Sequence, residues 1–382
     1  MPDHAIAPWG ESRPREGCPV PSKGFRKVVL PSRYVQGRRA IDSIGSYAAD
    51  LGSRPFVVAG RRAFAAVGSR MGASLEAAGV PMVGHDDSVT ECTHAKIDSV
   101  RSRAEELKAG LVIGAGGGKA VDTAKAAADR ASLPVITVPT QCATNADQMA
   151  DAVIFTEEHQ FVKDHYLERP PALVLVDTEV VGLAPVKYLV QGMGDAVASG
   201  VEKPAYAAAM RARGADQLAA TAALEINMKC YDILMAHGAE AKRDSQRREI
   251  TEALEAVIEA IKLMSGFGFG GGGCAPAHAI HNGLITMPGV KKKHGEIVAY
   301  GTLVQMALED RSDGEILRLM QWCYEIGLPT STADLGDIEA SELPSAAERA
   351  CNPSDTMSNM PFSVTPEMVM NAVARVDGLS HG

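Results

Sequence analysis

Residues 109–125 read AGLVIGAGGGKAVDTAK, in which an apolar run leads into three consecutive glycines, a lysine and an alanine-rich stretch. This order predicts a buried strand, a tight turn and a helix. Because glycine has no Cβ to obstruct an approaching anion, the first N–H groups of such a helix are open to a phosphate. We therefore expect the turn to bind phosphate. The alternative is a turn that uses glycine only for its backbone angles.

The stretch fits neither of the familiar phosphate-binding patterns. A P-loop has a glycine five residues before its Gly-Lys pair and Ser or Thr after it, but these positions are Ile113 and Ala120. The dinucleotide pattern GxGxxG fails because Lys119 stands where the third glycine belongs. A second cluster, at residues 266–273, contains GxGxxG but follows a predicted helix, so we interpret it as a turn beside the histidines after it. A P-loop NTPase is excluded, and the bound group stays open.

Strands and helices alternate on both sides of the glycine turn. Short β-branched runs, such as residues 55–60 (PFVVAG) and 80–84 (VPMVG), are separated by helical patterns and predict a parallel α/β sheet. Farther on the patterns are long and helical, for example at residues 244–264, where apolar residues recur every three or four positions. We expect a loose N-terminal extension at residues 1–25, an α/β domain at 26–185 and an α-helical domain at 186–382.

The composition excludes several classes of protein. The 382 residues carry a net charge of −9, without the stripe of Lys and Arg interleaved with aromatic residues that a nucleic-acid binder needs. No signal peptide or long uncharged apolar stretch is visible, so we expect a cytoplasmic protein that does not bind membranes. The seven cysteines form no CxxC pair, which argues against a disulfide framework and against a thiolate zinc site.

A group of histidines indicates a metal site. His278 and His281 lie three residues apart, on one face of a predicted helix, and His294 follows a Pro-Gly turn. Together with Asp195, two of them could form a zinc site that keeps one position open for water or substrate. The alternative is that these histidines cap or pack helices. We expect the remaining histidines to be surface residues or hydrogen-bonded core residues.

Five motifs resemble the glycerol dehydrogenase branch of the iron-containing (group III) alcohol dehydrogenase family. They are GAGGGKAVDTAK, VLVDTEVVGLAP, GMGDA, AHAIHNGL and HGEIVAYGTLVQ, in this order, and the resemblance runs from about residue 34 to near the C-terminus. It implies a Rossmann-like N-terminal domain followed by an all-α domain, in the fold shared with dehydroquinate synthase, with the active site in the cleft between them. It also implies a nicotinamide cofactor, a metal ion, a small-molecule substrate and a homo-oligomer.

The resemblance assigns roles to individual residues. It implies that the cofactor pyrophosphate is held by Gly116, Gly117, Gly118 and Lys119, and that the metal is bound by Asp195, His278 and His294. The related iron enzymes have a further histidine at the position of Ser199, so three protein ligands favour Zn²⁺ over Fe²⁺. Zinc then acts as a Lewis acid on the substrate hydroxyl while hydride moves to the nicotinamide. His281 either relays the proton or orients the site.

The cofactor end of the chain departs from the family pattern. Glycerol dehydrogenases have an acidic residue after the second strand, where it holds the adenosine ribose. Here Gly60 takes that position, and Arg61 and Arg62 follow. Because an arginine can pair with a 2′-phosphate that a carboxylate repels, we predict that NADP is accepted, either alongside NAD or in preference to it. The alternative is that both arginines are solvated residues at the start of a helix.

The expected substrate loop, PTQCATNADQMADAVIF, departs as well. Thr140 and Thr144 keep their family positions, but the aspartate that meets substrate hydroxyls is replaced by Asn145. An amide donates as well as accepts, so it suits a carbonyl, carboxylate or phosphate, and glycerol itself is in doubt. Either Asp147 or Asp151 takes over the contact with the substrate hydroxyls, and Asp151 stands at a position that lies beside the cofactor in the family. The alternative is that both aspartates lie on a solvated loop.

We expect a zinc-dependent, NAD(P)-linked oxidoreductase that interconverts a small polyol or hydroxy compound and its carbonyl form. A dehydroquinate synthase-type lyase or cyclase shares the fold and uses NAD catalytically. It needs many Lys, Arg and Asn residues around its substrate, and only Lys291–Lys293 supply such a cluster near the expected ligands. A non-catalytic cofactor-binding relative is the third possibility, and the retained metal ligands argue against it.

Overall fold

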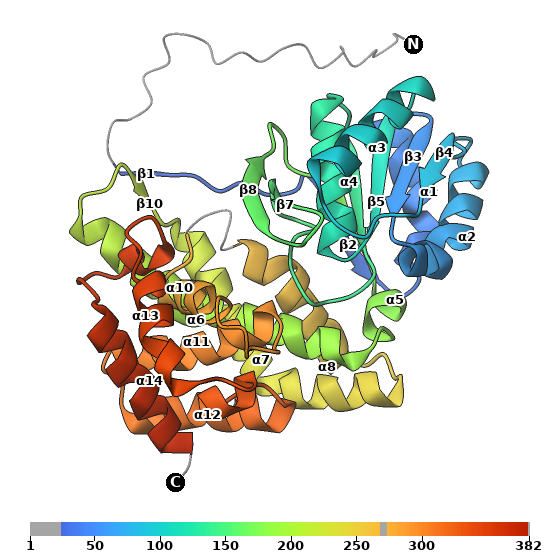
Figure 1. Cartoon of the computed structure of the whole chain (residues 1–382). Coiled ribbons are helices and arrows are strands. Elements are labelled where there is room, and N and C mark those ends of the chain that lie inside the picture. Colours follow the sequence, from blue (N-terminus) through green and yellow to red (C-terminus); the bar gives the residue numbers. More distant parts are fainter. Residues whose placement is uncertain (1–23, 268–272, 381–382) are drawn as a thin grey trace.

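The computed structural model describes residues 24–267 and 273–380. Its first half contains a six-stranded sheet in which all neighbouring strands are parallel (Figure 1). The order across the sheet is β2 (Tyr34–Gly37), β9 (Leu173–Asp177), β6 (Val135–Pro139), β5 (Leu111–Gly116), β3 (Pro55–Ala59) and β4 (Gly84–Asp86). The predicted parallel α/β sheet is confirmed.

Helices cover both faces of this sheet. Successive residues of a strand point to opposite faces, so in β3 Val57 packs with Met71 on one face, whereas Phe56 and Val58 pack with Ile97 on the other. Because both faces are covered, the central strands β3 and β5 are buried along their whole length and contain only apolar residues and glycine. The helices of this half are η1 (Ala40–Ser43), α1 (Ile44–Leu51), α2 (Arg61–Ala77), α3 (His94–Glu106), α4 (Gly118–Arg130) and α5 (Thr178–Gly182).

Two strands of this half differ from the prediction. The strand predicted at residues 80–84 is wrong in position, since β4 begins at Gly84. Pro81 has no N–H group to donate to a neighbouring strand, which disfavours a strand there. An antiparallel hairpin of β7 (Asp151–Phe155) and β8 (Phe161–Tyr166) was not predicted, and it follows the expected substrate loop.

The second half is helical, as predicted (Figure 1). Helix α11 is buried along almost its whole length, which explains why its sequence is apolar on every side. The elements are α6 (Val186–Ala212), β10 (Gln217–Leu218), α7 (Thr221–Arg247), α8 (Glu252–Glu259), a π-helical turn η2 (Ala260–Met264), α10 (Pro276–Leu284), α11 (His294–Leu308), α12 (Asp313–Ile326), α13 (Leu343–Ala350), α14 (Pro366–Ser380) and the 3₁₀ turns η3 (Thr332–Leu335), η4 (Ala340–Glu342) and η5 (Thr356–Asn359).

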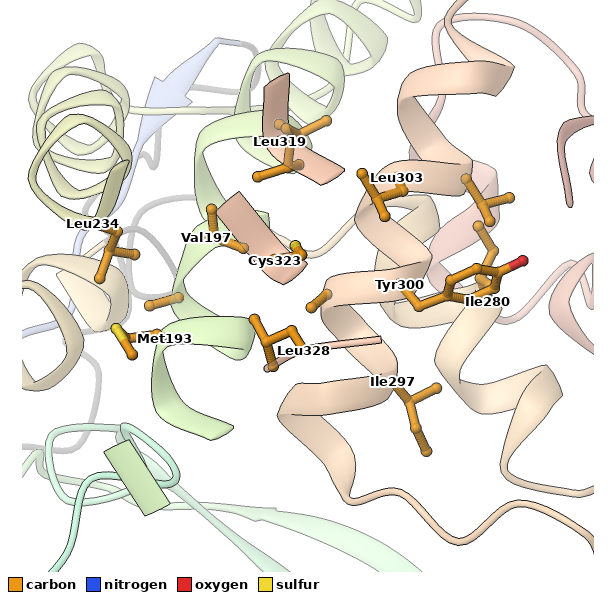
Figure 2. Close-up of a cluster of buried hydrophobic side chains, with 14 of the residues drawn as sticks. Met193, Val197, Leu234, Ile280, Ile297, Tyr300, Leu303, Leu319, Cys323 and Leu328 are labelled. Carbon is orange, nitrogen blue, oxygen red and sulfur yellow. The ribbon is translucent and has the colours of Figure 1, made fainter. Parts of the chain in front are cut away.

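Apolar side chains from several helices meet between α6 and α11. Figure 2 shows Met193 and Val197 of α6 on one side and Leu303 of α11 on the other. Burying such a side chain contributes roughly 1.5–3 kcal/mol. Tyr300 of α11 is fully buried in the same cluster, and its hydroxyl donates a 3.0 Å hydrogen bond to Asp377 of α14. This core holds α6 and α11 in fixed relative positions.

The helical stretch predicted at residues 244–264 is not one helix. Helix α7 ends before Arg248, which has a left-handed φ of 62°. Helix α8 then begins after Thr251, whose hydroxyl oxygen accepts a hydrogen bond from the N–H of Leu254. The helix stop and the new cap explain the break within an otherwise helical pattern.

The two halves are connected at more than one place. The predicted boundary near residue 185 falls in the turn between α5 and α6. In addition, β1 (Phe25–Arg26) pairs in parallel with β10, which lies between α6 and α7. Most of the predicted N-terminal extension, residues 1–23, lies outside the described residues, as do residues 268–272 of the second glycine cluster. No helix in the described part of the chain is both long and apolar enough to cross a bilayer.

Candidate active site

The glycine turn lies between β5 and α4, as its sequence predicts. Gly116 has a φ of +152°, and an added Cβ would come within 2.8 Å of the Cβ of Ala120, so this position requires glycine. Gly117 is the N-cap of α4, and no side chain caps the helix. The N–H groups of Gly118 and Lys119, the first two residues of α4, are therefore left to an anion that approaches the helix N-terminus.

Lys119, in the first turn of α4, is already ion-paired within the protein. Its Nζ lies 2.8 Å from Oε2 of Glu91, and the same carboxylate oxygen contacts Nδ1 of His159. Burial alone would raise the pKa of Glu91, but hydrogen bonds from Lys119 and from the N–H of Cys92 outweigh it and lower the pKa. The lysine side chain is half exposed, so its role toward a pyrophosphate stays a prediction.

The residues that stand in place of the ribose-binding acid lie at the start of α2. Gly60 is the N-cap of this helix, directly after β3. Arg61 and Arg62 are its first two residues and are exposed, and neither is ion-paired with another residue in the described part of the chain. Both guanidinium groups are therefore available to an anionic ligand.

The loop between β6 and β7 lies against the glycine turn. The N–H of Thr140 donates a 3.0 Å hydrogen bond to the carbonyl oxygen of Gly116. An added Cβ at Gly118 would lie 3.6 Å from Oγ1 of Thr144. The structure thus brings both predicted threonines beside the predicted pyrophosphate site.

Two buried lysines hold this loop, and sequence analysis missed both. Lys125 of α4 is fully buried, and its Nζ donates to the carbonyl oxygens of Ala146, Met149 and Asp151. It also lies 2.9 Å from Oδ1 of Asp122. Because an ammonium group is rarely buried without such partners, Lys125 fixes the backbone of the loop from the side of the sheet.

Lys262 holds the loop from the helical half. Its Nζ lies 2.7 Å from Oδ1 of Asp147 and donates a 2.6 Å hydrogen bond to the carbonyl oxygen of Thr144. The alternative of a solvated loop is therefore wrong for Asp147, which is 2% exposed. Lys262 itself lies in the π-helical turn η2, and π-helical turns are frequent at functional sites.

Asn145 and Asp151 have different surroundings. The amide nitrogen of Asn145 donates a 3.0 Å hydrogen bond to Oγ of Ser265, in the helical half, and the side chain is buried. One N–H and the carbonyl oxygen of this amide remain for another partner. Asp151 is the first residue of β7, where it pairs with Tyr166 of the hairpin, and its contact with a cofactor stays a prediction.

Three predicted metal ligands come together from three helices. Asp195 lies on α6, His278 on α10, and His294 is the first residue of α11. Their ligand atoms lie within 4.8 Å of one another. Nε2 of His278 lies 3.5 Å and Nε2 of His294 3.4 Å from Oδ1 of Asp195. Two ligands that are each about 2.0–2.1 Å from a tetrahedral zinc ion lie ~3.3 Å apart, so these distances fit a shared metal.

Close helix packing brings these ligands together. An added Cβ at Gly192, three residues before Asp195, would come within 1.8 Å of the carbonyl oxygen of Cys142 in the loop after β6. An added Cβ at Gly295, next to His294, would come within 2.0 Å of the carbonyl oxygen of Gln191. Only glycine permits these approaches, which place the predicted metal ligands of α6 and α11 beside the loop between β6 and β7.

The buried charges also fit a cation. Burial alone would raise the pKa of Asp195, but the adjacent rings of His278 and His294 outweigh burial and hold the pKa below its usual value. Burial lowers the pKa of His278, but Cys274, Glu202 and Asp195 around its ring raise it well above the usual value. Oδ1 of Asp195 is buried and has no hydrogen-bond partner among the described residues. A buried carboxylate oxygen without a partner is costly, and a metal ion at this point would satisfy it.

His281 lies behind His294 rather than among the ligand atoms. Its Nε2 is 3.1 Å from Nδ1 of His294, and its Nδ1 is 3.0 Å from Oδ1 of Asn282. Burial, together with the charge of His294, lowers the pKa of His281 to about 3. The neutral ring therefore accepts a hydrogen bond at Nε2 from the Nδ1–H of His294 and donates one from its own Nδ1–H to Oδ1 of Asn282, which leaves Nε2 of His294 free to bind a metal.

Other histidines have ordinary partners, as predicted. His94 lies 2.8 Å from a nitrogen of Arg130, His165 lies 2.9 Å from Asp129, and His85 stacks on the ring of Phe64. His4 and His381 lie outside the described residues. The side chains that sequence analysis missed at the metal cluster are Glu202 and Asn282. Glu202 follows Asp195 by seven residues, so the helical repeat places it on the same face, and this spacing could have indicated it.

Comparison with known proteins identifies the family. A family model described as iron-containing alcohol dehydrogenase matches residues 31–178. A glycerol dehydrogenase from Pseudomonas putida is 38% identical over 362 residues, which cover 93% of this chain and 98% of that protein. A glycolaldehyde reductase from Halobacterium salinarum is 36% identical over 353 residues, which cover 91% of this chain and 96% of that protein. The crystal structure of glycerol dehydrogenase from Schizosaccharomyces pombe superposes with a TM-score of 0.87 at 31% identity, covering 94% of this chain and 92% of that one.

These similarities extend over both halves of the chain, so they include the glycine turn as well as the metal cluster. They confirm the resemblance drawn from the five motifs and the fold of a Rossmann-like half followed by an all-α half. The chain belongs to the iron-containing alcohol dehydrogenase family, whose members are NAD(P)-dependent, metal-containing alcohol dehydrogenases.

Proposed function

We propose that this dehydrogenase interconverts a small polyol or hydroxy compound and its carbonyl form, with a zinc ion held by Asp195, His278 and His294. The observation that carries the proposal is the buried Oδ1 of Asp195, which has no hydrogen-bond partner among the described residues and faces two imidazole nitrogens at 3.4–3.5 Å. We place the division between the cofactor-binding and metal-binding parts near residue 185.

The donor set favours zinc over iron. Two imidazoles and one carboxylate leave one position of a tetrahedral ion open, which is the arrangement of catalytic zinc sites. When bound, the metal supplies a Lewis acid that polarises the hydroxyl or carbonyl oxygen of the substrate. The ring of His294 is 43% exposed, whereas the side chains of Asp195 and His278 are largely buried. The chain therefore binds the metal from the inside and leaves the side of His294 accessible.

The glycine turn is proposed to bind the pyrophosphate of NAD or NADP. Gly116, Gly117 and Gly118 leave the N-terminus of α4 open to the anion, and Lys119 lies at its edge. Thr140 and Thr144 line the adjoining loop, while Gly60 and Arg61 lie where the adenosine ribose is expected. Nicotinamide bound there supplies the hydride acceptor or donor.

The substrate is proposed to be a small compound with adjacent oxygen functions. The relatives include glycerol dehydrogenases and a glycolaldehyde reductase, whose named substrates are both of this kind. Asn145 retains a carbonyl oxygen and one N–H after its hydrogen bond to Ser265, so it can accept from a hydroxyl and donate to a carbonyl. This amide is proposed to orient the substrate at the metal.

His281 is proposed to orient the metal ligand His294. The hydrogen bonds from His294 to His281 and from His281 to Asn282 form a chain that ends at the carboxylate of Asp355. The alternative is that His281 relays a proton. This requires its ring to gain a proton, although burial lowers the pKa of His281 to about 3.

The proposal is tested with protein stripped of metal by a chelator. We expect turnover of a small polyol to vanish and to return on addition of one equivalent of Zn²⁺ per chain, and more weakly with Fe²⁺. A screen of polyols, 2-hydroxy acids and their carbonyl forms, each with NAD and NADP, identifies the substrate. Net formation of reduced cofactor in proportion to product distinguishes the dehydrogenase from a lyase that uses NAD catalytically.

A pair of histidine variants checks the metal assignment. His278→Ala is expected to abolish both metal binding and turnover, since it removes a buried ligand. His237→Ala, on the exposed side of α7, is the matched control and should keep both. Full activity in the first variant would remove the assignment. We also propose a homo-oligomer, which light scattering of the purified protein tests directly.

A further inference from the structure

Glu202 has no role in the proposed reaction, yet its carboxylate lies directly behind His278, one of the three predicted metal ligands. Glu202 is seven residues after Asp195 on α6, two helical turns along the same face. Its side chain is 0% exposed, while Asp195, two turns earlier, belongs to the group of three predicted metal ligands. A fully buried carboxylate is among the least favourable groups in a protein interior unless its oxygens are hydrogen-bonded.

In the described part of the chain, the hydrogen-bond donors to Glu202 come from the N-cap and the first turn of α10. Its Oε1 accepts from the backbone N–H of Ala275 at 2.9 Å and from that of His278 at 3.1 Å. Its Oε2 lies 2.8 Å from Nδ1 of the His278 ring. One side chain thus contacts both the backbone and the imidazole of the same residue.

The backbone contacts hold the beginning of α10. Pro276, the first residue of the helix, has no N–H group, and the N–H of Ala277 donates to Oε1 of Gln305 at 3.0 Å. The N–H of His278 donates to Glu202. Side chains from α6 and α11 therefore replace the local cap that α10 lacks, and the negative charge of Glu202 lies at the favourable end of the helix dipole.

The contact with the ring determines which nitrogen of His278 is available. An ionised carboxylate only accepts hydrogen bonds, so the proton of the imidazole lies on Nδ1. Nε2 is then the nitrogen that gives up its proton and offers a lone pair when a metal binds, and it faces Oδ1 of Asp195 at 3.5 Å. In metal sites, a carboxylate behind a histidine ligand fixes the ring orientation and the tautomer in this way.

We infer that Glu202 is a positioning residue that fixes His278 as an Nε2 ligand of the metal, and this inference rests on the proposed metal site. Cys274 lies beside the same ring, so Glu202, Cys274 and His278 also have ligand atoms within 4.8 Å of one another. The hydrogen bond from Nδ1 to Glu202 assigns that side of the ring to Glu202 instead of a metal.

Glu202→Gln is the informative substitution because it keeps the size of the side chain. The single amide oxygen must still accept from the two backbone N–H groups, so the amide NH₂ turns toward Nδ1. That group donates, which forces the proton of the ring onto Nε2, the nitrogen that the metal needs. The variant therefore opposes metal binding while the packing of α6 and α10 is retained.

The matched control is Gln305→Met. It removes the other side-chain cap of α10, the acceptor for Ala277, without touching the ring of His278. Both variants are expected to lower the midpoint temperature of thermal unfolding. Only Glu202→Gln is expected to weaken Zn²⁺ binding, by about 10- to 100-fold in competition with a chelator, with activity recovering at excess Zn²⁺.

The outcomes separate this inference from the proposed site itself. Zn²⁺ affinity of Glu202→Gln within twofold of the wild type, or an equal loss in Gln305→Met, overturns the positioning role. Wild-type protein that binds no divalent metal overturns the proposed function instead. If Glu202→Gln does not fold, ¹⁵N spectra of histidine-labelled, zinc-loaded wild type decide the matter, with His278 assigned by its absence in His278→Asn. A proton on Nδ1 and zinc on Nε2 are expected, and zinc on Nδ1 overturns the inference.

Discussion

Lys262 of the helical half and Asp147 of the loop after β6 form an ion pair of 2.7 Å in which each side chain is 2% exposed. The same ammonium group also donates a hydrogen bond to the carbonyl oxygen of Thr144, and the side-chain amide of Gln148 donates one to the backbone carbonyl oxygen of Lys262. The position of the loop is thus set by a partner 115 residues farther along the chain.

Replacing one member of this pair is expected to destabilise the protein strongly. Lys262→Met leaves the carboxylate of Asp147 buried without a counter-charge, which costs about 3–5 kcal/mol. Because Thr144 and Asn145 lie in the same loop, kcat/KM should fall as well. Urea unfolding and steady-state kinetics measure the two effects. In the double variant Lys262→Met/Asp147→Leu, stability should largely return; an unchanged urea midpoint in the single variant would contradict the prediction.

The two arginines at the start of α2 are expected to select the phosphorylated cofactor. A charged hydrogen bond contributes about 1.5–3 kcal/mol, so Arg61→Ala/Arg62→Ala should raise KM for NADPH by roughly tenfold or more. KM for NADH should stay within about twofold, because NADH has no 2′-phosphate to lose. Initial rates with both cofactors measure this. Arg103→Ala, an exposed arginine of α3, controls for loss of surface charge. Equal changes for NADH and NADPH would show that neither arginine meets the 2′-phosphate.

Acid is expected to destabilise the first half of the chain through Asp42 in η1. Hydrogen bonds from Arg70 and Arg39 lower the pKa of Asp42 to about 2, whereas an unfolded aspartate has a pKa of about 3.9. The folded pKa is the lower one, so the contribution of Asp42 is present above pH ~4 and is lost as the pH falls toward ~2. Asp42→Asn should reduce the loss of stability between pH ~4 and pH ~2. Thermal midpoints between pH 5 and pH 2.5 test it, and parallel curves for variant and wild type would rule it out.

Local patterns in the sequence predict the fold and part of the site well. The strand, turn and helix around Gly116 are adjacent in the chain, and the glycines specify their own backbone angles. The expected metal ligands His278 and His294 lie only sixteen residues apart, and motif order adds Asp195. These features needed no knowledge of how distant segments pack.

Long-range pairs could not be predicted in this way. Lys262 and Asp147 are each of a residue type that is usually solvated, and only the packing of the two halves buries them beside one another. Lys125 is buried within the first half, against carbonyl oxygens 21–26 residues farther along the chain. The same holds for Glu202, whose partner ring is 76 residues away. The strand predicted at residues 80–84 is misplaced for a different reason: Pro81 is visible in the sequence and disfavours a strand there, but the prediction followed the apolar residues alone.

Helix α6 connects the parts of the site that come from elsewhere in the chain. Gly192 contacts the loop after β6, Asp195 reaches the metal cluster and Glu202 holds the start of α10. An α-helix advances about 1.5 Å and turns about 100° with each residue. Inserting or deleting one residue between Gly192 and Glu202 would therefore swing one of these groups a quarter of a turn or more away from its partner. The number of residues in this segment of α6 is thus constrained by the geometry of the helix.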